Sequence, residues 1–455
     1  MRGTGSPGLC LRFQGLRLGA LPVPSTPGVA CRGVTRTVQW ICLIYFAYVN
    51  LPSFFFFLPV FCVDNSGVGF SPAAASRRER PGVGLGREER AVQSCEQAEV
   101  GAEGTEQGQR TRGTRDWVFL RGVIGSGLCI FSKFPILDTL LYQYSLNGYP
   151  YMLQHGDWFC GKSVGLAVIK ISGIVFNVYV THLHAEYCRE KDAYLPHRVV
   201  QAWELLQFIR HTSKAADVVL LGGDLNMHPQ DVGIRLLRCW TGLRDAFTET
   251  KRFEGCEDGC TLIPSNRFTV KSELQPFPLG IRIDYILYKA GSSFTVKCEE
   301  LQTTTGTAPG TDIPYSDHEA VMATLHVQRT GQAAGVTPGT AVPALVEVLS
   351  EARTEVRVGL LAARRQRYSS GRMALLALLL LLLQAAAALG ALAGLADGQP
   401  FPKLSFALLA FLALGVLLLA TGLHLFHTIE VKMLQGTEEQ MRMALGVLQE
   451  RPGRS

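Results

Sequence analysis

The stretch ADVVLLGGDLNMHP, Ala216–Pro229, decides how the middle of this chain folds. Its apolar run predicts a buried strand, which ends in two glycines followed by Asp224, Leu225 and Asn226. Because side chains alternate between the two faces of a strand, Asp224 and Asn226 share one face. The glycines allow a backbone or a ligand to approach closely. The stretch therefore predicts a polar site at the end of a strand.

Short runs of apolar or alternating apolar residues also lie on either side of this stretch, and they predict a mixed α/β domain over residues 117–328. Between two of them, residues 191–217 carry apolar side chains at helical spacing, which predicts a helix. Alternating strand and helix textures are typical of the α/β and α+β classes. The other expected strands are GLCIFSKFPI, VGLAVIKI, GIVFNVYVTHLHAE, IRIDYILYKA and AVMATLHV.

Two further motifs place histidines beside carboxylates. In VFNVYVTHLHAE, strand alternation puts His182, His184 and Glu186 on one face. Two histidines at this spacing could bind zinc, but no third strong ligand follows at a familiar spacing, so we expect a structural role for His184. In YSDHEA, Asp317 and His318 come directly before the last expected strand, and strand ends are where open α/β sheets place their sites.

The composition excludes several classes of protein. Charged residues are 18% of the 455, the formal charge is +6, and no dense Lys/Arg run marks a nucleic-acid surface. The 12 cysteines are scattered and only Cys256 and Cys260 lie close together, so we expect neither a disulfide framework nor a Cys-rich zinc site. The sequence therefore predicts no nucleic-acid partner and mostly structural thiols.

Residues 1–116 differ from the rest of the chain. They are rich in Gly, Arg, Pro and Ser and show no repeated strand or helix pattern, so we expect this region to be mostly disordered. An apolar segment, residues 40–63, interrupts it and is long enough to cross a bilayer. Asn50, Pro52, Ser53 and Pro59 weaken it as a helix, so a membrane span and a non-membrane segment both stay open.

Two strongly apolar runs near the C-terminus predict a transmembrane hairpin. Residues 373–396 and 402–426 each exceed the roughly 20 residues that a bilayer core requires, and a short break joins them. Neither run has a polar face, which disfavours the alternative of two buried core helices. Residues 329–372 are expected to be a polar linker, and residues 427–455 a tail.

The orientation of the hairpin follows from its flanking charges. By the positive-inside rule, the arginines before the first run place both outer ends in the cytosol, together with the tail and the α/β domain. An internal membrane such as the endoplasmic reticulum is the expected location. The arginines are Arg353, Arg357, Arg364, Arg365, Arg367 and Arg372, while only Lys403 lies near the connecting loop.

The order of the motifs resembles the endonuclease/exonuclease/phosphatase superfamily. A histidine strand, a strand ending in GDLN, the strand RIDYIL and then SDH before a final strand all occur in that order. Longer phrases, such as YSLNGYPYMLQHGDWFCGKSVGL and RVVQAWELLQFIRHTSKAADVVLLGGDLNMHP, are similar to the small neutral sphingomyelinases with two C-terminal membrane helices. The resemblance covers about residues 119–328 and the hairpin at 373–426.

This resemblance implies a DNase I-like fold, in which two packed sheets are flanked by helices. It also implies an enzyme that uses Mg²⁺ to hydrolyse sphingomyelin, a membrane lipid, to ceramide and phosphocholine. Such a reaction needs hard oxygen ligands for the metal, an activated water, and donors for the charge that develops on phosphorus.

The resemblance assigns a role to each matching residue. His318 is the expected general base and Asp284, in RIDYIL, the carboxylate that orients it. Asp224 and Asn226 are expected to polarise the water and bind the phosphate, and His182 to bind and stabilise the phosphoryl oxygens.

Asp317 is the expected neighbour of the metal. Asp157 and Lys162 resemble a regulatory Asp–Lys pair, and the alternative for them is an exposed ion pair of little energetic consequence.

The chain departs from the family pattern at its N-terminal end. There the family carries a strand with an asparagine, followed by the glutamate that is the principal Mg²⁺ ligand, and nothing in residues 1–116 matches either. Glu88, Glu89 and Glu96 follow no expected strand. We therefore expect an N-terminally incomplete sandwich and weak Mg²⁺ binding. The alternatives are a membrane-anchored, non-catalytic isoform, or a phosphodiesterase for lyso-phosphocholine lipids or phosphoinositides.

Overall fold

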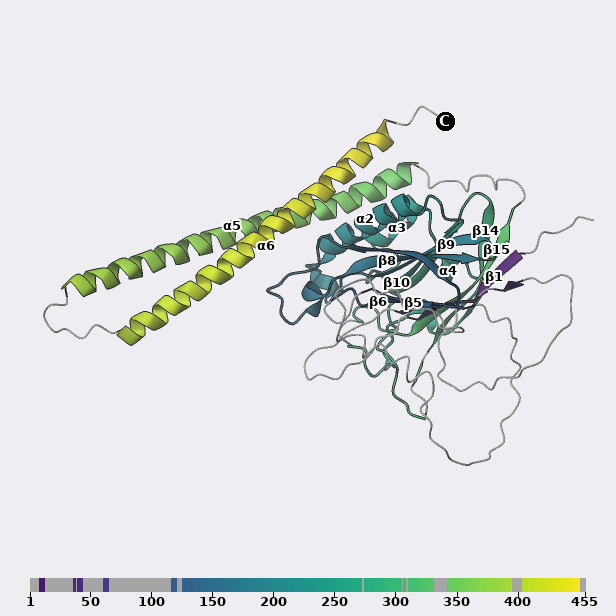
Figure 1. Ribbon diagram of the computed structural model, residues 1–455, viewed down its shortest axis with the longest axis horizontal. Coiled ribbons are helices and arrows are strands. Elements are labelled where there is room, and N and C mark those ends of the chain that lie inside the picture. Colours follow the sequence, from purple (N-terminus) through teal and green to yellow (C-terminus); the bar gives the residue numbers. More distant parts are fainter. Residues whose placement is uncertain are drawn as a thin grey trace, which may run out of the picture. The chain divides into compact units, whose positions relative to one another are not determined.

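The computed structural model describes residues 8–12, 36–37, 39–43, 60–64, 116–120, 125–271, 274–304, 306–307, 310–330, 342–394 and 403–450. The chain divides into two compact units, Met1–Leu345 and Val346–Ser455. Figure 1 labels their helices and strands, and each unit is described by itself.

A six-stranded sheet with the order β11-β13-β10-β9-β8-β7 forms one layer of the first unit. β9 and β10 are parallel, because helix α2 (Leu195–Thr212) connects them, and the other neighbouring pairs are antiparallel. The strands are β7 (Ile136–Gln143), β8 (Ser163–Ile171), β9 (Ile174–His182), β10 (Val218–Asp224), β11 (Arg244–Asp245) and β13 (Asp284–Ala290).

The second layer is a sheet that has nine strands within the described residues. Its main path is β12-β14-β15-β3-β4-β6-β5, and β1 pairs with β15 and with β2. The strands are β1 (Gly8–Arg12), β2 (Arg36–Thr37), β3 (Gln39–Leu43), β4 (Val60–Asp64), β5 (Asp116–Leu120), β6 (Leu128–Ser132), β12 (Arg252–Glu254), β14 (Phe294–Thr304) and β15 (Ala320–Arg329).

The hydrophobic core lies between the two sheets. Phe176 and Ile286 of the first sheet and Ile130, Val296 and Leu325 of the second belong to one buried cluster. Alternate side chains of each inner strand enter this core, as the period of two requires. The predicted DNase I-like sandwich is therefore confirmed.

Helices α2 and α3 (Val232–Thr241) cover the outer face of the six-stranded sheet (Figure 1). The Tyr179 hydroxyl on that face lies 2.7 Å from Oγ1 of Thr212 in α2. The two helices contact each other through Trp203 and Trp240, whose ring centroids are 5.5 Å apart. Shorter helical turns are η1 (Gly156–Phe159), η2 (Arg189–Lys191), α4 (Ala246–Glu249) and η3 (Glu257–Gly259).

The N-terminal region contributes short strands to the second sheet. Four short strands, β1 to β4, lie within residues 1–116, although the sequence showed no repeated strand pattern there. β3 and β4 occupy the two ends of the apolar segment 40–63 and pair antiparallel, from Gln39↔Asp64 to Leu43↔Val60. Aromatic and β-branched residues favour strands, and Pro52 and Pro59 oppose a continuous helix. Residues 44–59 lie outside the described residues.

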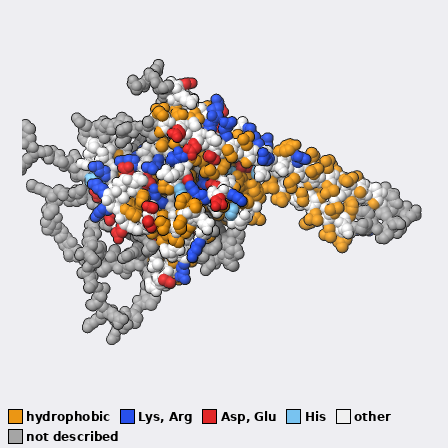
Figure 2. Space-filling view, turned by 180° about the vertical axis from the view of Figure 1, so that it is seen from behind, with side chains coloured by type: hydrophobic (Ala, Val, Ile, Leu, Met, Phe, Trp, Pro, Cys, Tyr) orange, Lys and Arg blue, Asp and Glu red, His pale blue; other side chains and the backbone are white. Residues whose placement is uncertain are grey.

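The second unit contains two long helices, α5 (Val342–Gly394) and α6 (Lys403–Gln449). Both are long and apolar enough to cross a membrane, which fits the predicted hairpin. Figure 2 shows the apolar side chains that cover much of this unit. The two helices include residues 373–394 and 403–426 of the expected spans, and residues 395–402 lie outside the described residues.

Helix α5 also includes most of the segment 329–372, for which we expected only a polar linker. Leu349, Ala352, Val356 and Ala363 are buried at heptad-like spacing, as in a coiled-coil seam. The seam packs along α6, because Arg353 Nη2 and Glu438 Oε1 form an ion pair of 2.6 Å across the two helices. Residues 427–449 of the expected tail are likewise part of α6.

Candidate active site

Three neighbouring strands of the six-stranded sheet end in polar residues at one point. Asp224 at the end of β10 is directly opposite His182 at the end of β9 and Asp284 at the start of β13. Each of the three continues the core-facing positions of its strand, for example Val178 and Val180 before His182. The site therefore lies where the hydrophobic core gives way to polar side chains at the edge between the sheets.

His318 and Asp284 form the first part of the site. The imidazole Nδ1 of His318 lies 2.7 Å from Oδ2 of Asp284, and both side chains are buried. The turn before β15 presents His318, whose backbone N–H donates to Ser316 Oγ at 3.1 Å. When Nδ1–H of the neutral ring donates a hydrogen bond to Asp284, Nε2 is left as an acceptor. This arrangement suits a general base.

Asp224, Asn226 and His182 form the second part. Oδ1 of Asp224 accepts the backbone N–H of Asn226 at 2.8 Å, and its Oδ2 accepts Nδ2 of Asn226 at 2.9 Å. Nε2 of His182 lies 3.3 Å from the same Oδ2. Asn226 has a φ of 47°, a left-handed conformation that asparagine tolerates better than most residues. Gly222 and Gly223, together with this turn, place the side chains of Asp224 and Asn226 side by side at the end of β10.

Burial and charge shift the pKa values of these groups. Burial on its own lowers the pKa of His318, but Asp284, followed by Asp317 and Asp224, raises it to about 10. Burial raises the pKa of Asp284, and the nearby His318 only partly offsets that effect. Burial alone would also raise the pKa of Asp224, but its hydrogen bond to His182 lowers it. The site therefore concentrates negative charge around one imidazole.

Asp224, Asp284 and His318 form a candidate metal site, since their ligand atoms all lie within 4.8 Å of one another. Oδ1 of Asp284 is buried and has no hydrogen-bond partner, so a cation would satisfy it. Two carboxylates suit Mg²⁺, which commonly uses one or two protein carboxylates together with water and substrate phosphate oxygens. The donor set therefore fits a hard divalent cation.

The structure does not add the expected metal neighbour Asp317 to this group. Its Oδ1 lies 3.1 Å from Ser316 Oγ, and its backbone carbonyl accepts the Thr269 hydroxyl at 3.0 Å. No glutamate joins the group within the described part of the chain.

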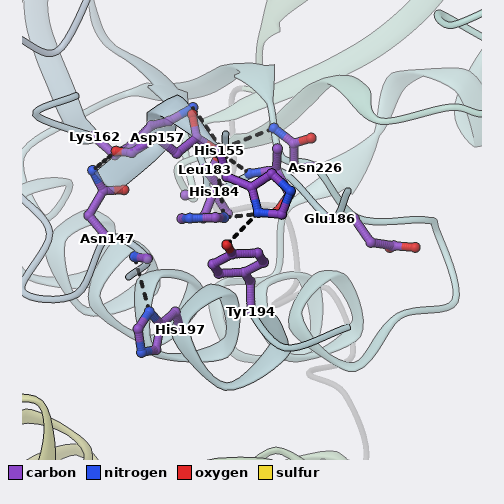
Figure 3. A network of polar contacts seen from close by, with 12 residues as sticks. Asn147, His155, Asp157, Lys162, Leu183, His184, Glu186, Tyr194, His197 and Asn226 are labelled. Carbon is purple, nitrogen blue, oxygen red and sulfur yellow. Dashed lines mark hydrogen bonds and ion pairs between the residues drawn. The ribbon is translucent and has the colours of Figure 1, made fainter. Parts of the chain in front are cut away.

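Asp157 and Lys162 lie next to the site and are buried, so the alternative of an exposed ion pair is wrong. Their Oδ1 and Nζ are 3.0 Å apart, with side chains only 12% and 3% exposed. Oδ2 of Asp157 accepts the backbone N–H of Ala185 at 2.7 Å. Lys162 Nζ donates to the carbonyl of Leu183 at 3.2 Å, and Asn226 Nδ2 donates to the same carbonyl at 3.0 Å (Figure 3). The pair thus holds the segment that directly follows His182.

His184 lies in a cluster of aromatic rings, in agreement with its expected structural role. It stacks on Tyr194 with ring centroids 4.2 Å apart, and its Nδ1 lies 2.8 Å from the carbonyl oxygen of Ala185. Burial lowers the pKa of His184 to about 3, so the ring is neutral at physiological pH. Figure 3 shows it beside His155 and Tyr194.

Comparison with known proteins supports the same assignment. A model of the Endonuclease/Exonuclease/phosphatase family matches residues 70–318, more than half of the chain. The chain belongs to this family.

Within the family, the chain is similar to sphingomyelin phosphodiesterases. Sphingomyelin phosphodiesterase 2 of Mus musculus is 53% identical over 328 residues, which are 71% of this chain and 76% of the mouse protein. The Homo sapiens protein of the same name is 49% identical over 331 residues, covering 72% and 76% of the two chains. The predicted membership in the neutral sphingomyelinase group is therefore confirmed.

A solved structure has a low similarity to this chain. Sphingomyelinase C from Streptomyces griseocarneus is 18% identical, with a TM-score of 0.34 over 44% of this chain and 68% of that one. This likeness is too low to support the assignment, which rests on the sequence relatives and the family match.

Some residues around the site of this family member carry no recognisable sequence signal. Asn266 donates to the carbonyl of Ser316 at 2.8 Å and to Oε1 of Glu319 at 3.2 Å, and so holds the turn that presents His318. Arg189 bonds Asp231 at 2.7 Å and Glu186 at 3.0 Å, and so joins the segments that follow His182 and Asn226. The contacts of Asn266 and the Arg189–Asp231 pair join positions far apart in the sequence, so only the fold reveals them.

Proposed function

We propose that this chain is a neutral sphingomyelinase, which hydrolyses sphingomyelin to ceramide and phosphocholine. One observation carries the proposal: the His318–Asp284 pair, 2.7 Å apart, opens onto the same strand ends as Asp224, Asn226 and His182. A base with its orienting carboxylate and a set of phosphate-binding donors are the groups that hydrolysis of a phosphodiester requires. The names of the relatives support sphingomyelin as the substrate.

In the proposed reaction, His318 Nε2 accepts a proton from water while the water oxygen bonds to phosphorus. The bond from phosphorus to the ceramide oxygen breaks, and that oxygen leaves with the electron pair and takes up a proton. Asp284 holds the imidazole in the tautomer that this step needs. His182 and Asn226, which bond Oδ2 of Asp224 in the structure, would each exchange that bond for one to the phosphoryl oxygens as their negative charge grows.

The proposed cofactor is Mg²⁺, held by Asp224 and Asp284 with Asp317 nearby. When bound, the cation would polarise the phosphoryl oxygens and offset the negative charge of the carboxylates. Because a pKa of about 10 keeps His318 protonated at neutral pH, the imidazole needs such an offset before it can act as a base. We therefore expect hydrolysis to depend on a divalent cation.

We further propose a regulatory role for the Asp157–Lys162 pair. Its support is that Lys162 and Asn226 donate to one carbonyl, that of Leu183, while Asp157 accepts the amide of Ala185. A movement of this pair would therefore shift the Leu183 carbonyl. That carbonyl follows His182 directly in the chain and accepts a hydrogen bond from Asn226.

The proposed location is an internal membrane such as the endoplasmic reticulum, spanned by α5 and α6, with the first unit in the cytosol. The support is the length and composition of the two helices and the arginines before the first apolar run. Anchoring brings the catalytic unit to a substrate that does not leave the bilayer readily, because tethering raises the effective concentration.

A non-catalytic, membrane-anchored protein is the second candidate. The observation in its favour is that no glutamate joins Asp224, Asp284 and His318 within the described residues. An enzyme that hydrolyses a sphingolipid with a different headgroup is the third candidate. Inositol phosphosphingolipids phospholipase C of Saccharomyces cerevisiae is 31% identical over 239 residues, which are 47% of this chain.

The deciding experiment measures phosphocholine release from sphingomyelin by the full chain, with Mg²⁺ and with a chelator, beside His318→Ala. Release that needs both Mg²⁺ and His318 is expected. No release by folded wild-type protein would favour the non-catalytic candidate. Faster release from lyso-phosphocholine lipids, or inositol phosphate release from an inositol sphingolipid, would change the assigned substrate.

A further inference from the structure

Helix α6 carries a second apolar stripe on the side that faces away from α5. Its positions follow each other in alternating steps of four and three residues from Leu408 to Val447. None of these positions carries a charge, and Gln440 is the polar member. All are exposed except Phe426, which is half-buried. We call this set the outer stripe.

The outer stripe lies opposite the seam between α6 and α5. On α6 the seam includes Ala413, Ala420, His427, Leu434 and Met441, which are buried and recur every seven residues. Every position of the outer stripe follows a seam position by two residues, which is a rotation of about 200° around the helix. Because the seam supercoils α6 at the same seven-residue period, the outer stripe keeps one direction instead of drifting by about 20° per heptad.

Half of the outer stripe lies beyond the apolar run that ends at Phe426. Ile429, Met433, Met443 and Val447 belong to this half, and each is between 37% and 55% exposed. Val447 is 21 residues past Phe426, which is about 31 Å along the helix. A helix face that water covers carries mainly charged and polar side chains. These four large apolar side chains therefore indicate a face that a partner covers.

The part of α5 that lies before its apolar run has a different outer surface. Glu351, Arg357, Arg364 and Arg365 are all exposed there, as is typical of a helix face in contact with water. The uncharged outer surface of this unit therefore belongs to α6.

Three glycines occupy equivalent places in the outer stripe. Gly415 and Gly422 are seven residues apart, and Gly436 follows fourteen residues later. A Cβ added to any of them would meet nothing within 4 Å, so the packing of α6 on α5 does not require glycine there. Glycine disfavours a helix more than any residue except proline. Small residues on a membrane helix allow the backbone of a second helix to approach closely, which gives these glycines a use.

We propose that the outer stripe packs against the outer stripe of a second copy of this chain, as two parallel helices around a twofold axis along the membrane normal. The stripe passes from the apolar run into the part of α6 beyond it. Lipid would cover only its first half, and a soluble helix only its second half. Two copies in one membrane share their orientation and depth, so their stripes meet in register. The pairing requires membrane insertion of α5 and α6 and is independent of catalysis.

Parallel pairing suits the residues along the stripe. In a twofold contact each position meets its own counterpart, so glycines meet glycines and no like charges are brought together. Gln440 meets Gln440 of the second copy, and one polar residue in an apolar seam fixes the register and the number of helices. From Leu408 to Val447 the stripe is about 59 Å long, and a helix about 11 Å wide gives about 650 Å² per copy. A stable interface takes roughly 600 to 1,000 Å² from each partner.

The first experiment counts the copies of the chain in each particle. The full chain, with one fluorophore at its C-terminus, is placed in phosphatidylcholine vesicles and extracted as nanodiscs with a styrene–maleic acid copolymer. Photobleaching steps are counted for single nanodiscs as the ratio of protein to lipid is lowered. We expect two steps at high ratios and one step after dilution. Single steps at every ratio would overturn the proposal.

The first pair of variants tests the glycines. Gly415→Ile combined with Gly422→Ile should raise the dissociation constant of the dimer about tenfold or more, because the new side chains hold the two backbones apart. Gly390→Ile is the matched control. Gly390 is exposed on α5, and an added Cβ there also meets nothing within 4 Å, so the dimer should be unaffected. Equal dissociation constants for both variants and the wild type would overturn the proposal.

The second pair of variants tests the part of the stripe beyond the apolar run. Met443→Glu places two like charges opposite each other, so the dissociation constant should rise about tenfold or more, and less at high salt. Val358→Glu, on the exposed side of α5, introduces the same charge at a residue of similar exposure, 55% against 54%, and should leave the dimer unchanged. An equal effect of the two changes would contradict pairing through α6.

A photoreactive benzophenone amino acid in place of Met443 identifies what covers the stripe. The expected product has twice the mass of the chain and joins position 443 to α6 of the second copy. A product of single mass that joins position 443 to residues 1–345 would show that the first unit covers the stripe, and would overturn the proposal. Removal of the protein from the vesicles by alkaline extraction would contradict membrane insertion, and the pairing with it. Phosphocholine release is measured separately, so its absence from a dimeric wild type would contradict only the proposed function.

Discussion

Lys162 and Asn226 donate hydrogen bonds to the same backbone carbonyl, that of Leu183, at 3.2 and 3.0 Å. Leu183 directly follows His182, so one carbonyl links the Asp157–Lys162 pair to two residues of the proposed site. The link passes through a buried and charged group, which makes its loss measurable in both activity and stability.

Lys162→Met should lower kcat with a smaller effect on KM. The change removes the donor to Leu183 and leaves Asp157 unpaired, so the His182 and Asn226 side chains lose a support. A misplacement of about 1 Å in such groups costs about 100-fold in rate. Steady-state kinetics on sphingomyelin vesicles would measure it. Lys170→Met, at an exposed position of the same strand, is the matched control and should have nearly wild-type kinetics.

Asp157 should make the stability of the first unit depend on acid pH. Burial alone would raise the pKa of Asp157, but Lys162 and then His184 hold it well below its usual value of 3.8. A group whose pKa is lower in the folded state stabilises the fold above the unfolded value, and this contribution is lost as the pH falls below about 3.8.

The test compares wild type with Asp157→Asn by denaturant unfolding at several pH values. At pH 7 the variant should be less stable by about 3 kcal/mol, because Lys162 is left buried and unpaired. The difference should shrink as the pH is lowered through 3.8 and below. A difference that stays constant from neutral to acid pH would show that the pair does not hold the carboxylate ionised.

Asp284→Asn should lower kcat by about 100-fold to 10,000-fold with KM little changed. The carboxylate bonds His318 Nδ1, and loss of its charge weakens the orientation and basicity of the imidazole. Asp245→Asn is the control, since it alters an equally buried carboxylate that pairs with Arg282 at 2.8 Å outside the site. Similar losses of kcat in the two variants, both folded by thermal unfolding, would contradict a specific role for Asp284.

Gly223→Ala should destabilise the first unit by about 3 kcal/mol or more. Its φ is 147°, and an added Cβ would lie 2.0 Å from the carbonyl oxygen of Thr181 on the neighbouring strand. The neighbouring backbone would have to move, and Asp224 with it. Gly173→Ala serves as the comparison, because its φ is 86° but no atom lies within 4 Å of the added Cβ. Thermal unfolding should show a clearly smaller loss there, due to backbone strain alone.

Much of the fold and the site was predictable from local pattern. The apolar strand before Asp224, the alternation before His182 and the two apolar runs each follow from periods that are visible in the sequence. The strands β1 to β4 were not predictable, because short segments become strands only when they pair with β15 and β6, which lie far away in the chain. Residues 342–372 were expected to be part of a linker for a similar reason, because their apolar positions form a buried seam only when α6 packs against them.

By itself, the sequence determined the family, the strand ends and the set of polar side chains that the chemistry needs, because these depend on neighbouring residues and on motif order. The tertiary structure decided which of them meet. It placed His318 against Asp284, buried the Asp157–Lys162 pair on the carbonyl of Leu183, and left Asp317 outside the group of candidate ligands. These relationships depend on distances and burial between segments remote in the chain, which no local pattern encodes.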